Sequence, residues 1–198
     1  MAERQEIPLF PLGNVLFTGG RLPLQIFEPR YLDLVGRCMK DDTGFGVVLI
    51  REGRETFQGH GPPALFDIGT YAKIIDFNQL ANGLLGIVCT GGTKFRIHRS
   101  WEAPDHLVMA EVEFLDDERP GTVASEFQPL VDTLRVLTKH PMIQRLNLDI
   151  DYRDARSVSW RLAELLPLEP ETKQSLLQMQ LPSERLVEIQ RLVAKLKG

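Results

Sequence analysis

Several features that would place a protein in a common class are scarce or absent in this sequence. Its 198 residues include only two cysteines, Cys38 and Cys89, which excludes a dense disulfide framework and indicates a reducing compartment. No apolar run approaches the roughly 20 residues of a membrane-spanning helix, and the polar N-terminus lacks the apolar core of a signal peptide. These absences predict a cytoplasmic protein that does not enter a membrane.

The chain also has little excess of one sign of charge, but its basic and acidic residues are unevenly distributed along the sequence. The formal net charge of -4 gives the chain no general attraction for a phosphate backbone. Residues 1–118 hold 11 basic and 17 acidic side chains, a balance of -6, whereas residues 119–198 hold 12 and 10, a balance of +2. Nucleic-acid binding would therefore have to depend on a local basic cluster.

Motifs that carry out catalysis are missing as well. The chain has no Gly-Lys dipeptide, hence no phosphate-binding P-loop, and no GxSxG nucleophile elbow. The four histidines lack the spacing of a metal site, and the settings of both cysteines are typical of small core residues. The sequence predicts a non-catalytic, ATP-independent protein with no cofactor, no catalytic residue and no metal ligand. A hydrolase or small-molecule site built from His60, His98 or His106 stays open as an alternative.

The first part of the chain consists of short β-type segments separated by glycine and proline, a spacing that predicts a compact β-barrel or sandwich. Apolar residues alternate with other residues from Val108 to Phe114, as in a strand with one buried face. One helix is expected to begin at Pro29, because apolar residues then recur at spacings of three and four. These are Tyr31, Leu32, Leu34, Val35, Cys38 and Met39.

After an acidic, turn-rich segment at residues 116–121, the hydrophobic period becomes that of helices. Helices are expected near residues 123–139, 160–166 and 171–179, with a last one whose first turn contains Pro182. Pro129 falls inside the first of these, and the sequence leaves open whether it kinks that helix or marks its start. The change of period predicts an α+β protein with parts at residues 1–118 and 119–198.

The best basic cluster lies around residues 94–99, where Lys94, Arg96 and Arg99 are interleaved with aromatic residues. Strand alternation would place Lys94 and Arg96 on one face, and a solvated strand face is the interpretation favoured over RNA binding. The preceding Gly91-Gly92-Thr93 is expected to be a turn between strands. The acidic residues 116–118 are expected to be solvated.

One stretch is more informative than any catalytic motif. Residues 7–12 (IPLFPL), 15–17 (VLF) and 22–31 (LPLQIFEPRY) resemble the opening of the Lon protease N-terminal, substrate-binding domain family. Further similar segments follow in the family's order through both halves, so the resemblance covers nearly the whole chain. They lie at residues 45–50, 68–72, 91–97, 110–112, 159–167, 173–178 and 185–186.

The resemblance implies an N-terminal PUA-like β pseudo-barrel with one inserted helix, followed by a C-terminal α-helical bundle. It also implies a stand-alone member without the ATPase and protease domains of full-length Lon. The implied function is non-catalytic binding of unfolded or degron-bearing polypeptides, as an adaptor or modulator of proteolysis. The alternative is an RNA-binding PUA-like module, although the acidic first half disfavours nucleic acid. A protease or chaperone partner and a homodimer are both left open.

The family-matching residues also supply a candidate peptide-binding surface. Apolar groups near Phe17 and Leu22 to Leu24 are expected to be exposed, with Arg30 and Tyr31 at the edge of a shallow groove. A purely structural role is the competing interpretation, in which Pro29 starts a helix and Glu28 caps it or pairs with Arg30. The full candidate set is Pro11, Phe17, Leu22, Leu24, Phe27, Glu28, Arg30 and Tyr31.

Overall fold

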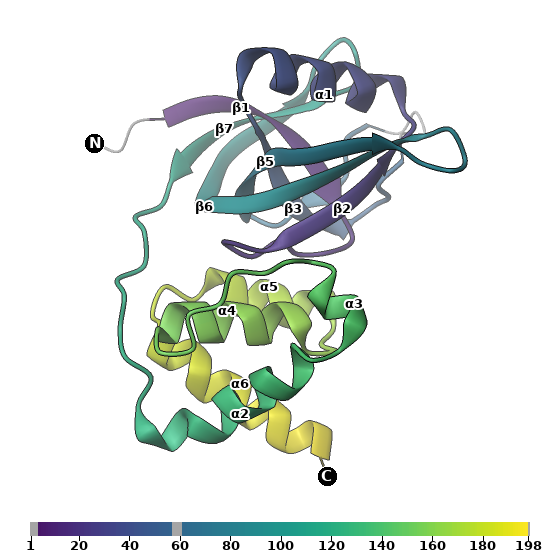
Figure 1. Ribbon diagram of the computed structural model, residues 1–198. Coiled ribbons are helices and arrows are strands. Elements are labelled where there is room, and N and C mark those ends of the chain that lie inside the picture. The colour runs from purple at the N-terminus through teal and green to yellow at the C-terminus, as the bar shows by residue number, and fades with distance from the viewer. Residues whose placement is uncertain (1–3, 57–60, 198) are drawn as a thin grey trace. The chain divides into compact units, whose positions relative to one another are not determined.

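The computed structural model describes residues 4–56 and 61–197, which form two compact units, one up to residue 116 and one from residue 117 onward. The first is a seven-stranded, largely antiparallel sheet with one helix, and the second is helical, so the protein is of mixed α and β class (Figure 1). No helix in the described part of the chain is both long and apolar enough to cross a membrane.

The first unit is organised by strand pairings that return to their starting strand. The sheet order is β1-β7-β6-β5-β3-β4, β2 pairs with β6, and β1 also pairs in parallel with β3, so the path from β1 to β3 closes on itself. One helix, α1, is inserted between β2 and β3. The bounds are β1 Arg4–Leu12, β2 Arg21–Ile26, α1 Pro29–Asp41, β3 Phe45–Glu52, β4 Ala64–Leu65, β5 Ile68–Gln79, β6 Leu85–Glu102 and β7 Val108–Phe114.

Two sequence patterns in this unit are confirmed. In β7, Val108, Ala110 and Val112 are buried while the residues between them are partly exposed. Helix α1 begins at Pro29 and buries the face that carries Tyr31, Leu34, Val35 and Cys38 in a core shared with β1, β2, β3, β5 and β6. Leu32 and Met39, which were expected in the same stripe, are instead 41% and 43% exposed.

The prediction of a turn at residues 91–93 is wrong, because Gly91 and Gly92 lie inside the long strand β6. A side chain at Gly91 would place its Cβ 2.2 Å from the Phe17 carbonyl oxygen. The Gly91 carbonyl accepts a hydrogen bond from Gly19 N at 2.7 Å, so the turn after Phe17 lies directly against the strand. Here glycine marks a close approach of two backbone segments.

The second unit contains five α-helices and one short 3₁₀ helix in its described residues, and α4 packs against α2, α5 and α6. The predicted helix at 123–139 is shorter in the structure, and Pro129 lies in the first turn of α2, so it marks the start of that helix. Pro182 lies in the first turn of the last helix, as predicted. The bounds are η1 Ser125–Phe127, α2 Gln128–Leu137, α3 Pro141–Gln144, α4 Ala155–Leu165, α5 Pro170–Gln178 and α6 Pro182–Lys197.

Candidate functional site

The structure divides the candidate surface residues into a buried group and an accessible group. Pro11, Phe17 and Leu22 are buried, and Phe17 is completely inaccessible, so the expectation that Phe17 and Leu22 are exposed is wrong. Leu22 lies opposite the buried Cys89 of β6. The segment after Phe17 is held to the same strand, since Thr18 Oγ1 donates to the Gly92 carbonyl at 2.9 Å. These contacts make the buried group part of the core.

Four of the remaining candidates, Leu24, Phe27, Glu28 and Tyr31, line one cavity of about 200 Å³. We call it the Phe27 pocket, because that side chain is 57% exposed although it is large and apolar. The pocket is formed by the end of β1, by β2, by the start of α1 and by the segment that follows β3. Its complete lining is Phe10, Leu12, Pro23, Leu24, Gln25, Phe27, Glu28, Tyr31, Glu55 and Thr56.

Aromatic packing gives this pocket a firm wall. The rings of Phe10 and Tyr31 stack with centroids 3.9 Å apart at an interplanar angle of 14°, and the Phe45 ring lies 5.6 Å from Phe10. Tyr31 is buried because it faces the core from the first turn of α1. A preformed apolar wall of this kind can receive an apolar side chain without first having to be ordered.

Arg30 supports the pocket from outside its lining. Its Nε donates to Glu28 Oε2 at 3.0 Å, and its Nη1 and Nη2 donate to the backbone oxygens of His106 and Glu55 at 2.8 and 3.2 Å. Glu28 makes no side-chain hydrogen bond that caps α1, so of its two expected structural roles the pairing with Arg30 is the one observed. The arginine thus connects three segments of the first unit and fixes the position of the Glu28 carboxylate.

The surroundings of Tyr31 in the pocket disfavour ionisation of its hydroxyl. The pKa of Tyr31 is raised to about 12, chiefly because its hydroxyl is removed from water. The Arg30 cation opposes this rise, while the Glu28 and Glu55 carboxylates add to it. Tyr31 is therefore neutral near pH 7 and acts as a ring surface in the pocket.

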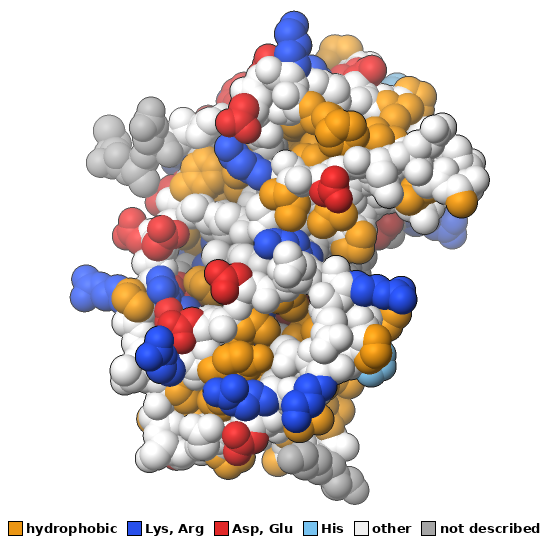
Figure 2. All heavy atoms as spheres, in the orientation of Figure 1, with side chains coloured by type: hydrophobic (Ala, Val, Ile, Leu, Met, Phe, Trp, Pro, Cys, Tyr) orange, Lys and Arg blue, Asp and Glu red, His pale blue; other side chains and the backbone are white. Residues whose placement is uncertain are grey.

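Exposed apolar side chains also occur on this unit outside the pocket. Hydrophobic side chains gather over α1 and β5 on the face seen in Figure 2. Among the described residues of this unit, the exposed large apolar ones are Phe27, Leu32, Met39, Ile75 and Phe77.

The basic cluster expected on one strand face does not form. Lys94 is only 4% exposed, whereas Arg96 is exposed, so the two do not share an accessible face. Arg99 lies 3.6 Å from carboxylate oxygens of both Glu6 and Glu111. A register shift between Ile97 and Arg99 also interrupts the alternation from which the cluster was predicted. The RNA-binding alternative loses the observation on which it depended.

The two described histidines of this alternative, His98 and His106, pair with different glutamates. His98 pairs with Glu113 at 2.9 Å, His106 pairs with Glu102, and His60 lies outside the described residues. In the described ranges, no group of three or more His, Cys, Asp or Glu side chains could hold a metal ion.

Both cysteines are buried and unpaired, as expected for small core residues. Burial raises the pKa of each thiol, that of Cys89 to about 12. The thiolate is the nucleophilic form of cysteine, so neither environment favours nucleophilic chemistry.

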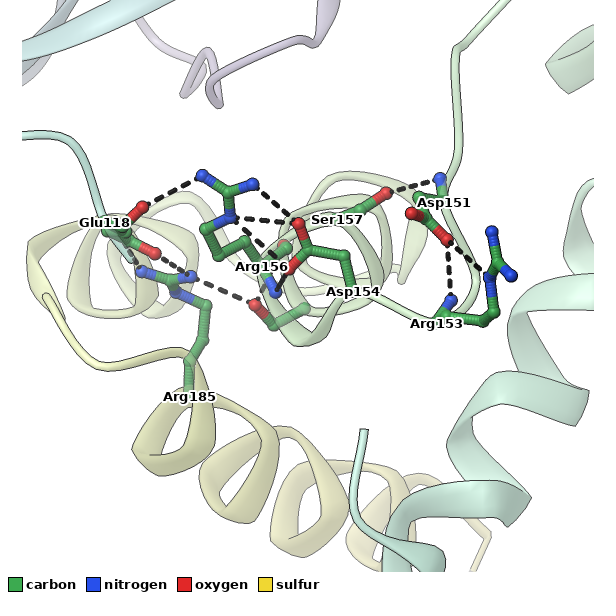
Figure 3. A network of polar contacts seen from close by, with 8 residues as sticks. Glu118, Asp151, Arg153, Asp154, Arg156, Ser157 and Arg185 are labelled. Carbon is green, nitrogen blue, oxygen red and sulfur yellow. Dashed lines mark hydrogen bonds and ion pairs between the residues drawn. The ribbon is translucent and has the colours of Figure 1, made fainter. Parts of the chain in front are cut away.

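Sequence reasoning missed a buried polar network in the helical unit (Figure 3). Glu118, expected to be solvated, is 6% exposed, and its carboxylate pairs with the fully buried guanidinium of Arg185. Arg156 Nη1 donates to the Glu118 carbonyl at 2.9 Å and is itself paired with Asp154, the residue that caps α4. Glu118 and Arg185 are 67 positions apart, so no local pattern could reveal this pair.

The fold and pocket define a mixed α/β domain with an accessible apolar site on its sheet unit. Residues 6–195 match the family described as the ATP-dependent protease La (LON) substrate-binding domain, and the chain belongs to this family. A crystal structure of a Lon N-terminal domain protein from Xanthomonas campestris is 34% identical, covers 96% of this chain and 98% of its own, and superposes with a TM-score of 0.75. The N-terminal domain of a Mycobacterium avium complex Lon protease, 15% identical with a TM-score of 0.59, shares the fold.

Curated relatives carry the same family name. The Lon protease of Parabacteroides distasonis is 29% identical over 136 residues, which are 67% of this chain and 16% of the relative. The Lon protease of Escherichia coli K12 is 25% identical over 195 residues, or 93% of this chain and 24% of that protein. The chain thus spans a quarter or less of the length of these relatives. The similarity supports a polypeptide-binding role.

Proposed function

We propose that this chain is a non-catalytic protein that binds unfolded or degron-bearing polypeptides through the Phe27 pocket. The observation that carries the proposal is an accessible apolar cavity, beside a 57% exposed Phe27, in a member of the Lon substrate-binding domain family. Unfolded chains expose apolar side chains that a folded protein hides, and burial of such a side chain stabilises the complex by about 25 cal/mol per Å² of apolar surface.

The candidates at the pocket support this assignment in different ways, and Tyr31 does so as a buried residue of its wall. Leu24 and Phe27 supply apolar contact area, Tyr31 supplies the stacked wall, and Glu28 is held in place by Arg30. Pro23 lies in the middle of β2, where it has no backbone N–H to offer to an added strand. We therefore assign recognition to side-chain insertion into the pocket in preference to strand addition along β2.

Replacing Phe27 with serine is expected to weaken binding of a permanently unfolded, carboxymethylated test protein by about tenfold, or ~1.4 kcal/mol, because a central apolar anchor is lost. Phe77→Ser is the matched control, since Phe77 is 56% exposed on β5 and does not line the pocket. Fluorescence anisotropy with the labelled test protein measures both variants. Equal losses in the two variants would contradict the assignment to this pocket.

We further propose that this binding serves proteolysis, with the chain acting as an adaptor or modulator. The names of the relatives support this role. Adding the purified chain to a Lon-type protease that is degrading an unfolded substrate is expected to change the degradation rate, and Phe27→Ser is expected to abolish most of that change. A rate that stays constant at saturating concentrations of the chain would refute the role.

We also propose the finer architecture implied by the family, a PUA-like pseudo-barrel over residues 1–118 and a helical bundle over residues 119–198. The closed path of strand pairings and the packing of α4 against three other helices support it. A cytoplasmic location is proposed as well, because the two cysteines are unpaired.

A further inference from the structure

The charged side chains among the described residues that line the Phe27 pocket are all negative. Its lining is largely apolar with two neutral polar residues, Gln25 and Thr56, and the charged groups among the described lining residues are the carboxylates of Glu28 and Glu55. Among the described residues that line it there is no lysine, arginine or histidine. A ligand group beside the apolar cavity therefore meets negative charge first.

The arginine that contacts this lining, Arg30, is already engaged by other groups of the protein. Arg30 pairs with Glu28 and donates to two backbone oxygens, and its side chain is only 9% exposed. It compensates the charge of Glu28, while Glu55 Oε1 is held by the backbone N–H of Gly13 at 2.6 Å, a neutral donor. The sum over these three side chains is one negative charge, located at the rim of the cavity.

The two carboxylates of the pocket also affect the ionisation of Tyr31. Both carboxylates raise the pKa of the Tyr31 hydroxyl, which forms part of the pocket wall. Desolvation is the largest cause of that rise, the Arg30 cation opposes it, and Glu28 and Glu55 add to it. A ligand cation placed beside Glu55 is attracted by that carboxylate, whose partner Gly13 N–H carries no charge.

We infer that the Phe27 pocket selects polypeptide segments in which an apolar side chain is directly adjacent to lysine or arginine. This inference rests on the proposed function and names its substrate class. The apolar side chain enters the cavity beside Phe27 and Tyr31, and the neighbouring cation lies over the Glu55 carboxylate. An acidic neighbour in the same position is repelled by Glu55, so segments with Asp or Glu next to the apolar residue are disfavoured.

The test uses two fluorescent peptides that differ only in the residues flanking one Leu-Phe anchor, lysine in one and glutamate in the other. Because the peptides exchange a cation for an anion near a partly exposed carboxylate, the full chain is expected to bind the lysine peptide about tenfold more tightly in low salt. The preference is expected to shrink at high salt, where the Debye length falls to a few ångströms.

Glu55→Gln is the decisive variant. Glutamine keeps an oxygen that can accept the Gly13 hydrogen bond while removing the charge, so the fold around the pocket is retained. The preference for the lysine peptide is expected to be almost lost in this variant, because Arg30 compensates Glu28 and Glu55 carries the remaining negative charge. Asp33→Asn is the matched control, because Asp33 is an exposed carboxylate of α1 that does not line the pocket. It is expected to retain the full preference.

The outcomes separate this inference from the proposed function. Equal affinity of the wild-type chain for both peptides, with binding still dependent on Phe27, overturns the charge selection alone. An equal loss of preference in Asp33→Asn and Glu55→Gln also overturns it, because the effect then comes from the general acidity of the unit. If neither the peptides nor the unfolded test protein bind, the proposed function itself fails.

Discussion

Replacing Arg185 with methionine is expected to lower the free energy of unfolding of the helical unit by about 3–5 kcal/mol, because it leaves the buried Glu118 carboxylate without its partner. Both side chains are at most 1% exposed. Arg185 also donates to Ser159 Oγ and to the carbonyl oxygens of Leu176 and Met179 at 3.0, 3.0 and 2.6 Å, so the substitution removes several hydrogen bonds at once. Urea denaturation followed by far-ultraviolet circular dichroism measures the loss.

Arg191→Met provides the control for this prediction. Arg191 lies on the same helix and pairs with Glu188, but its side chain is 65% exposed, so a change within about 0.5 kcal/mol is expected. The double variant Glu118→Leu, Arg185→Met removes both buried charges together and is expected to recover part of the loss. If Arg185→Met is no more destabilising than Arg191→Met, the buried pair does not have the structural role assigned to it.

Phe17→Ala is expected to destabilise the sheet unit by about 3–5 kcal/mol, because it empties a fully buried aromatic site. Phe27→Ala removes the same type of side chain from a position that is 57% exposed. It is therefore expected to change the free energy of unfolding by no more than about 0.5 kcal/mol. The same two variants should differ in the reverse order in binding to an unfolded polypeptide, provided that Phe17→Ala is assayed where it remains folded. Thermal and urea denaturation give the stabilities.

This pair of substitutions tests the division of the candidate residues directly. A large loss of stability in Phe27→Ala would mean that its ring is a structural element and would remove it from the binding surface. A Phe17→Ala protein as stable as the wild type would contradict the assignment of Phe17 to the core.

The pattern of apolar residues within one segment was sufficient to predict those elements whose structure depends on neighbouring residues alone. The alternation of β7 and the start of α1 at Pro29 were both predicted, because strand and helix periodicities are properties of neighbouring residues. The change from strand-type segments to helical periodicity also predicted the order of the two parts, and the family resemblance agreed with it. Of the candidate site, the resemblance identified four residues of the pocket but not Glu55, which comes from a different segment.

What could not be predicted depends on contacts between distant parts of the chain. An apolar residue such as Leu22 can belong to the rim or to the core, and only its pairing with Cys89, far along the sequence, decides. Gly91 looks like a turn residue until the backbone of Phe17 is placed against it. A carboxylate at a junction looks solvated until Arg185 is brought to Glu118 from the last helix.

The pairing of β1 with β7 has a consequence for how the first unit folds. Ile7 lies opposite Ala110, so β1, which precedes the other described strands of this unit, finds one of its partners only after most of the unit has been synthesised. Until then the backbone N–H and C=O groups on that side of β1 have no partner strand to hydrogen-bond with. Such long-range pairing slows folding because a large loop must close first. During translation, β1 is therefore a nascent strand with an open edge, which a chaperone or another unfinished chain can reach before β7 does.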